Sequence, residues 1–164
     1  MRLFSIIIWL LVFGKTGYGQ TIPKIISSKE LIGVWQEGTP QGSSAWRKCF
    51  VFYKNGKYIL HYSQYDDLAR IKDVTGKYFT KDSALYLQIE SRTEFVGGKL
   101  VHGEPSFQME EFVLEGFKPV VIKQKSEAEP FSISNCKSKN GAKCIQIANN
   151  KYYRIFSDPN KYTD

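Results

Sequence analysis

The sequence predicts an all-β protein, an antiparallel up-and-down β-barrel of about eight to ten strands with one short N-terminal helical turn. Short runs rich in β-branched and aromatic residues follow one another, with turn residues about every eight to twelve positions. Only the opening residues of the domain have a helical signature. A meander of this length is expected to stack as a sandwich or to close as a barrel, and closure removes exposed sheet edges.

Residues 1–19 have the features of a secretory signal peptide. Arg2 precedes an apolar run over residues 3–13, and Gly17-Tyr18-Gly19 places small residues at the cleavage position. This run is too short to span a bilayer, and no later run is long and apolar enough. We therefore expect one domain over residues 20–164, exported to the periplasm or the extracellular space, with no transmembrane segment.

The first predicted elements are a helical turn and a strand. Ser27 and Glu30 have the spacing of a capping box, which predicts one helical turn before a strand at 31–37. The clearest hairpin follows over residues 48–64.

In that hairpin, Asn55-Gly56 separates two β-rich runs and predicts a two-residue type I′ turn. The turn would pair Tyr53 with Tyr58 and would place Cys49 and His61 on opposite faces, which argues against a Cys-His dyad.

Further strands are predicted along the rest of the chain. A second hairpin covers residues 73–91 with its turn near Lys81 to Ser83, and Gly97-Gly98 predicts another reversal. Strands are expected at 106–116, 118–125, 143–148 and 152–158, and residues 126–141 are expected to form a polar loop.

Four stretches of the chain have a familiar order and spacing. They are "LIGVWQ" at 31–36, "FYKNGKYIL" at 52–60, "GKYFTKDSALYLQI" at 76–89 and "YYRIF" at 152–156. Together they resemble the lipocalin-like proteins, a calycin-type group of small secreted bacterial β-barrels. The resemblance covers about residues 28–157 and implies that the closed end of the barrel lies at the first strand.

The resemblance also implies structural roles for three residues. Gly33 would permit a tight approach of the chain, and Trp35 would plug the floor of the barrel. Arg154, from the last strand, would lie over the Trp35 ring as a cation–π contact.

The chain has three cysteines, Cys49, Cys136 and Cys144. An exported protein can keep disulfides, and Cys136 and Cys144 flank the turn-rich loop "CKSKNGAKC", which makes them the natural pair. Cys49 lies in an apolar run and is expected to be a small buried hydrophobe. The sequence leaves open which two of the three cysteines pair.

The charged residues argue against several classes of function. The formal charge of +7 includes Arg2 and Lys15 of the leader, so the remaining chain carries +5. Its lysines are scattered, with no basic helix or stripe, and nucleic-acid binding is not expected. His61 and His102 have no partner at metal-ligand spacing, so we predict no metal site, no cofactor and no catalytic residue.

Aromatic residues are the one residue class that stands out in the composition, at 15% of the chain. A barrel of roughly eight strands can enclose one small ligand. The sequence therefore predicts non-catalytic binding of a small apolar molecule in the barrel, with Tyr58, Tyr62 and Tyr78 as candidate lining residues. The alternative is a barrel with a filled core that binds an unidentified protein at the cell envelope through the loops at 37–47 and 126–141. An enzyme that uses Cys49 or a bound haem ranks last.

Overall fold

The structure is a computed structural model that describes residues 26–39, 46–64, 66, 68–102, 112–138 and 141–163. Its elements are α1 (Ser28–Leu31), β1 (Gly33–Glu37), β2 (Cys49–Phe52), β3 (Lys57–His61), β4 (Ile71–Lys81), β5 (Ala84–His102), β6 (Phe112–Lys123), β7 (Glu129–Cys136), β8 (Cys144–Ile147), β9 (Asn150–Phe156) and the 3-10 helix η1 (Pro159–Lys161).

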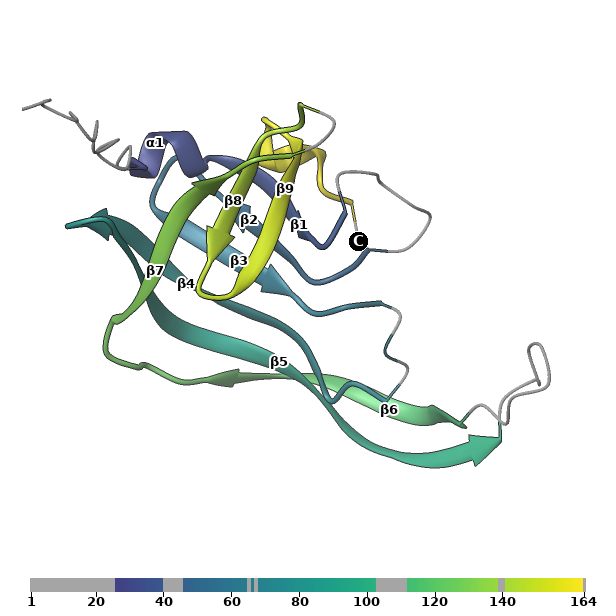
Figure 1. Cartoon of the computed structure of the whole chain (residues 1–164). Coiled ribbons are helices and arrows are strands. Elements are labelled where there is room, and N and C mark those ends of the chain that lie inside the picture. Colours follow the sequence, from purple (N-terminus) through teal and green to yellow (C-terminus); the bar gives the residue numbers. More distant parts are fainter. Residues whose placement is uncertain are drawn as a thin grey trace, which may run out of the picture.

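The strands form one antiparallel sheet in the order β4-β3-β2-β1-β9-β8-β7-β5-β6, and an additional pairing of β4 with β5 closes the barrel (Figure 1). β6 pairs with β5 at the end of this order and lies outside the closed ring. The predicted fold class, an all-β antiparallel barrel with one short helix, is confirmed.

Some sequence predictions fall outside the described residues. They are the signal peptide at 1–19, residues 40–45 of the first predicted loop, and residues 106–111 of one predicted strand. Among the described residues, no helix has the length and apolar character needed to cross a membrane.

The helix α1 packs against the core of the barrel. The backbone N–H of Ser27 donates to the Glu30 carboxylate at 2.9 Å, and the N–H of Glu30 donates to the Ser27 carbonyl at 3.0 Å. Leu31 and the preceding Ile26 are buried in the core, so the helical turn is held by both capping and packing.

The turn between β2 and β3 differs from the prediction. Gly56 N–H donates to the Tyr53 carbonyl at 3.2 Å, and Tyr53 N–H donates to the Lys57 carbonyl at 2.9 Å. Gly56 has a φ of 77°, and Asn55 is not among the residues with positive φ. The connection is therefore a three-residue loop that ends in a left-handed glycine, and not a type I′ turn.

The extra loop residue shifts the register of this hairpin by one position, so the predicted pairing was wrong. Tyr58 pairs with Phe52, and His61 pairs with Cys49. Because directly paired residues share a face, Cys49 and His61 lie on the same face and not on opposite ones.

This register decides what fills the barrel. One face of the hairpin carries Phe50, Phe52, Tyr58 and Leu60, which belong to or pack against the main core. The remaining core residues come from the other six barrel strands, from α1 and from the residues before α1: Ile26, Leu31, Trp35, Tyr78, Leu85, Leu87, Ile133, Ile145, Ile147 and Tyr152.

The second predicted hairpin is confirmed. Lys81 pairs with Ala84 across Asp82 and Ser83, which have positive φ values of 50° and 62°. This is the two-residue geometry that suits a right-twisted hairpin.

The predicted reversal at Gly97-Gly98 is wrong, because both glycines lie inside β5. They have φ values of 76° and 82°, and the opposing Gly116 has a φ of 71°. Glycines on both strands bend the ladder together, so pairing continues on either side, from Ser91 with Lys123 to His102 with Phe112.

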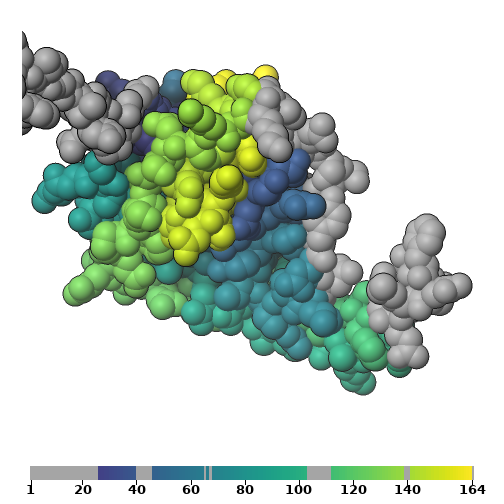
Figure 2. All heavy atoms as spheres, viewed as in Figure 1, coloured from purple at the N-terminus to yellow at the C-terminus, as the bar shows by residue number. Residues whose placement is uncertain are grey.

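Residues 91–102 of β5 pair with residues 112–123 of β6, and these two segments are here called the hairpin arm. The arm is two-stranded beyond Glu94, where the pairing of β5 with β4 ends. Its far end projects past the barrel, as Figure 1 and the space-filling view in Figure 2 show. The arm is the largest departure from a plain eight-stranded meander, and it creates a concave surface beside β3 and β4.

The segment 126–141 was predicted to be a loop, but it contains β7. Phe131 and Ile133 alternate with polar residues, and Ile133 reaches the core. Pro130 at the start of the strand and its Ser and Asn residues weaken the local strand signal.

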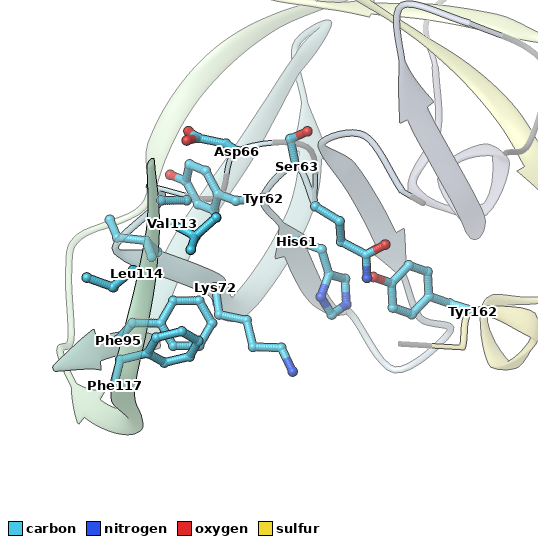
Figure 3. A pocket seen from close by; sticks show the side chains of 13 residues that line it. His61, Tyr62, Ser63, Asp66, Lys72, Phe95, Val113, Leu114, Phe117 and Tyr162 are labelled. Atoms are coloured by element: carbon cyan, nitrogen blue, oxygen red, sulfur yellow. The ribbon is translucent and has the colours of Figure 1, made fainter. Parts of the chain in front are cut away.

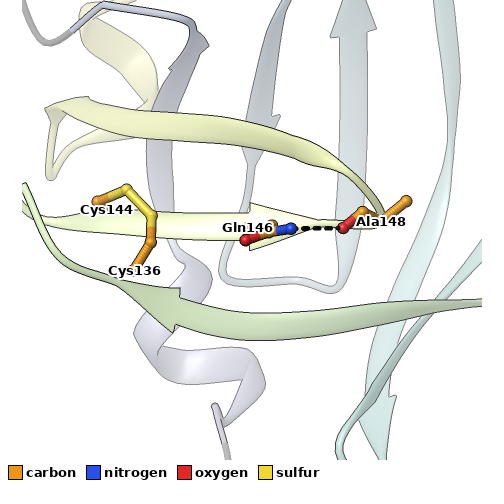
Figure 4. The surroundings of a disulfide bond; sticks show 4 residues. All are labelled: Cys136, Cys144, Gln146 and Ala148. Atoms are coloured by element: carbon orange, nitrogen blue, oxygen red, sulfur yellow. Dashed lines mark hydrogen bonds between the residues drawn. A yellow bond between two sulfur atoms is a disulfide. The ribbon is translucent and has the colours of Figure 1, made fainter.

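The disulfide between Cys136 and Cys144 is confirmed. The two residues are directly paired across β7 and β8, with Cα atoms 5.1 Å apart. Figure 4 shows this bridge, together with the Gln146 side-chain amide that donates to the Ala148 carbonyl at 3.2 Å. Cys49 takes no part in this disulfide, and it is buried.

Candidate functional site

Two of the three tyrosines predicted to line a ligand cavity lie in the packed core. Tyr58 is 2% exposed and Tyr78 is 5% exposed. The Tyr78 hydroxyl donates to the Tyr53 carbonyl at 2.9 Å. Burial, with smaller effects of Tyr62 and Glu129, raises the pKa of Tyr58 to about 12, and burial raises the pKa of Tyr78 to about 12.

Neighbouring rings fill the space around these tyrosines. The ring centroids of Phe52 and Tyr78 are 4.7 Å apart, and those of Phe50 and Tyr152 are 5.2 Å apart. Phe50 and Phe52 stack at 5.2 Å. Side chains packed at these distances leave little room for a ligand in this part of the interior.

Next to α1, Trp35 is buried and its indole N–H donates to the Leu31 carbonyl at 2.6 Å. The guanidinium carbon of Arg154 lies 4.6 Å from the centroid of the Trp35 ring. Partial burial lowers the pKa of Arg154, and the nearby Glu30 carboxylate opposes this shift. The Arg154 side chain is thus held in place by its contacts with Trp35 and with the carbonyls of Glu30 and Ile32.

Gly33 makes the close approach of β1 to β9 possible. Its φ is 131°, and a Cβ atom at this position would overlap the Phe156 carbonyl oxygen. No larger residue fits there without moving β9.

The most distinctive cavity lies outside the barrel, in the concavity of the hairpin arm. This hairpin cavity has a volume of about 580 Å³ (Figure 3). Residues from the end of β3, the β3–β4 connection, β4, both strands of the arm and the C-terminal segment line it: His61, Tyr62, Ser63, Gln64, Asp66, Ala69, Ile71, Lys72, Phe95, Val113, Leu114, Phe117 and Tyr162.

One wall of the hairpin cavity is apolar and belongs to the arm. Phe95 of β5 and Phe117 of β6 have ring centroids 4.4 Å apart. Val113 and Leu114 extend this wall along β6. The β5–β6 register brings these residues together, with Phe95 opposite Pro119 and Phe117 opposite Gly97.

The other wall is polar and aromatic. The ring of His61 stacks on Tyr162, with centroids 4.2 Å apart and an interplanar angle of 17°. Tyr62, the third predicted tyrosine, also lines the cavity, and the ammonium of Lys48, which does not line it, is 5.4 Å from the centroid of the Tyr62 ring. Lys72 contributes an ammonium group from β4.

The C-terminal segment positions Tyr162. The Asp158 carboxylate accepts from Asn160 N–H at 3.0 Å and starts η1. The Tyr162 ring lies 4.9 Å from that of Trp46, and Trp46 Nε1–H donates to the Thr163 carbonyl at 3.1 Å. These contacts fix the end of the chain against the outer face of the barrel.

Cys49 and His61 share this outer face, but Cys49 is fully buried and does not line the hairpin cavity. Within the ranges that the structure describes, no group of three or more His, Cys, Asp or Glu side chains is arranged to hold a metal ion.

A second surface cavity, of about 590 Å³, lies at the β2–β3 turn. Its lining consists of Tyr53, Lys54, Asn55 and residues 157–160, so most of it is polar. It lacks an apolar wall comparable to that of the hairpin cavity.

Sequence reasoning identified Tyr62 but missed Phe95, Phe117, Lys72 and Tyr162. The phenylalanines have no local signal beyond strand propensity, since their contact depends on the register of the arm. Tyr162 meets His61 only because the C-terminal segment folds back over β3.

The chain matches no protein-family model, and no curated protein or solved structure matches it either.

Proposed function

We propose that this protein is an exported, non-catalytic binding protein of the lipocalin-like group, and that its ligand occupies the hairpin cavity and not the barrel interior. The ligand is a small molecule with a substantial apolar part. The observation that carries the proposal is a cavity with a continuous apolar wall that faces a polar one.

The size of the hairpin cavity supports this function. Its volume of about 580 Å³ lies within the range of roughly 300–1,000 Å³ typical of small-molecule sites. Burying apolar ligand surface against Phe95 and Phe117 would supply the main driving force, and the polar wall would orient the ligand.

The packed interior favours this location over the barrel. Tyr58 and Tyr78 are enclosed by other rings, so a ligand between them would have to displace close contacts. Tyr62 is the predicted lining residue that remains part of the proposed site.

Other features of the chain support export and membership of the lipocalin-like group. The leader-like residues 1–19 and the disulfide suit an oxidising compartment. The contact between Trp35 and Arg154 fits the role that the lipocalin-like resemblance implies for them.

The test is binding of N-phenyl-1-naphthylamine, a neutral apolar dye whose fluorescence rises in apolar sites, to the chain without residues 1–19. Phe117→Ser should weaken binding at least about fivefold, because it removes most of one aromatic contact from the cavity wall. The matched control is Phe79→Ser, which alters a similarly exposed strand phenylalanine that does not line the cavity (45% against 37% exposed).

Loss of binding in Phe117→Ser alone supports the hairpin cavity. Equal binding by both variants, or no binding by the parent protein, contradicts it. The latter result would favour the alternative, a filled-core barrel that acts on another protein.

A further inference from the structure

The charged groups of the hairpin cavity are unevenly placed. His61 and Lys72 line its polar wall. Asp66 is the acidic residue among the lining side chains. Among the lining residues that the structure describes, two basic side chains therefore accompany one acidic side chain.

Two described acidic groups of this region have hydrogen-bond partners within the fold. The Asp66 carboxylate accepts from the Leu68 N–H at 3.2 Å, within its own turn. The Asp73 carboxylate, on the residue paired with His61, accepts from the Thr93 hydroxyl at 2.8 Å. In Figure 3 the Asp66 carboxylate and the Lys72 amino group lie at opposite ends of the cavity.

The apolar wall and the basic groups thus define a cavity with two chemically distinct sides. We propose that its ligand carries one carboxylate, bound by Lys72 and His61, and an apolar body that packs on Phe95 and Phe117. This inference rests on the proposed function, because it names the ligand class of the same cavity.

The physical basis is charge-assisted hydrogen bonding in a partly desolvated place. His61 is 8% exposed and Lys72 is half-buried. A carboxylate held there is screened less by water than at an open surface, and an N–H donor with a charge binds it more strongly than a neutral donor does. A neutral head group would gain less, and a cationic one would be repelled.

The test compares three compounds with the same ten-carbon chain, below their aggregation concentrations: decanoate, decanol and decyltrimethylammonium. Each competes with N-phenyl-1-naphthylamine for the chain without residues 1–19. Decanoate should displace the dye at about tenfold lower concentration than decanol, and decyltrimethylammonium should be the weakest of the three.

A pair of lysine variants locates the effect. Lys72→Met should remove most of the preference for decanoate and leave the affinity for decanol within about twofold. Lys72→Arg, which keeps the charge, should retain the preference. Lys57→Met is the control, since Lys57 is an exposed lysine of β3 that does not line the cavity.

The outcomes separate the two proposals. Equal displacement by decanoate and decanol overturns the carboxylate inference and leaves the hairpin cavity in place. Loss of the decanoate preference in Lys57→Met, or its persistence in a folded Lys72→Met, also overturns it. If Lys72→Met does not fold, the comparison of the three compounds on the parent protein decides. Failure of the parent protein to bind the dye contradicts the proposed function itself.

Discussion

The guanidinium of Arg154 lies over the ring of Trp35, with its central carbon 4.6 Å from the ring centroid. The same side chain donates from Nη2 to the carbonyl oxygens of Glu30 and Ile32, at 2.5 and 2.8 Å. Arg154 therefore ties the last strand both to β1 and to the carbonyls that end α1. One side chain thus links the first and the last strand of the barrel.

Replacing Arg154 should destabilise the fold. Arg154→Ala removes the cation–π contact and two charge-assisted hydrogen bonds, which should cost about 2–4 kcal/mol of unfolding free energy. Arg154→Lys should lose less, because the charge remains while the fork of donors is lost. Urea denaturation measures both, and Arg47→Ala, at an exposed arginine, serves as the control. A loss no larger than that of the control would contradict the structural role.

Gly33 should tolerate no side chain. Gly33→Ala places a Cβ atom against the Phe156 carbonyl oxygen, closer than any normal contact, and should cost on the order of 3 kcal/mol. Gly141→Ala is the comparison, because Gly141 has a φ of 69° and an added Cβ would meet no atom within 4 Å; there we expect only the backbone cost of about 1 kcal/mol. Equal melting temperatures for the two variants would show that the close approach of Gly33 to the Phe156 carbonyl does not restrict the residue at position 33.

The three cysteines should differ in their reactivity towards a thiol reagent. The folded protein should show no fast reaction with a thiol reagent, because Cys49 is fully buried. Unfolding without reductant should expose one thiol per chain, from Cys49, since Cys136 and Cys144 are bonded. The Cys136→Ser, Cys144→Ser double variant should lose about 2–3 kcal/mol of stability. Two or more reactive thiols in the unreduced, unfolded chain would contradict this pairing.

The buried tyrosines should make the protein sensitive to alkali. Burial raises the pKa of Tyr58 and of Tyr78 to about 12, whereas an unfolded tyrosine titrates near about 10. Because the folded pKa is the higher one, this contribution to stability is full below pH of about 10 and is lost as pH rises towards about 12. Absorbance at the phenolate band should show exposed tyrosines first and the buried ones later, together with unfolding. A single transition near the ordinary value, with the fold intact, would contradict the burial.

The stacking of Tyr162 should hold the C-terminal segment in place. Tyr162→Ala removes ring contacts to His61 and Trp46 and should cost about 2–3 kcal/mol. The fluorescence of Trp46 should shift to longer wavelength as water reaches its ring, while Trp35 stays buried. An unchanged emission spectrum and an unchanged melting temperature would show that the segment does not depend on this contact.

Much of the fold follows from local patterns. The capping box at Ser27 and Glu30, the turn at Lys81 to Ser83 and most strand positions are visible in the sequence, because turn and strand preferences act over a few residues. β7 was missed where its polar residues hide the alternation. The Gly97-Gly98 pair was misread, since glycines with positive φ serve a bend within a ladder as well as a reversal.

The sequence by itself determined the fold class, since hydrophobic alternation and turn residues favour antiparallel strands joined by hairpins. It did not determine the strand order, because β7 pairs with β5 and leaves β6 outside the closed ring. Only the tertiary structure decided which face of the β2–β3 hairpin points inward. Asn55-Gly56 is compatible with a two-residue and with a three-residue loop, which differ little in local energy. The three-residue loop is the one that buries Phe50, Phe52 and Tyr58 in the core that also holds Trp35 and Tyr78. The hairpin cavity depends likewise on contacts between distant parts of the chain, such as Tyr162 on His61, and no local preference encodes these.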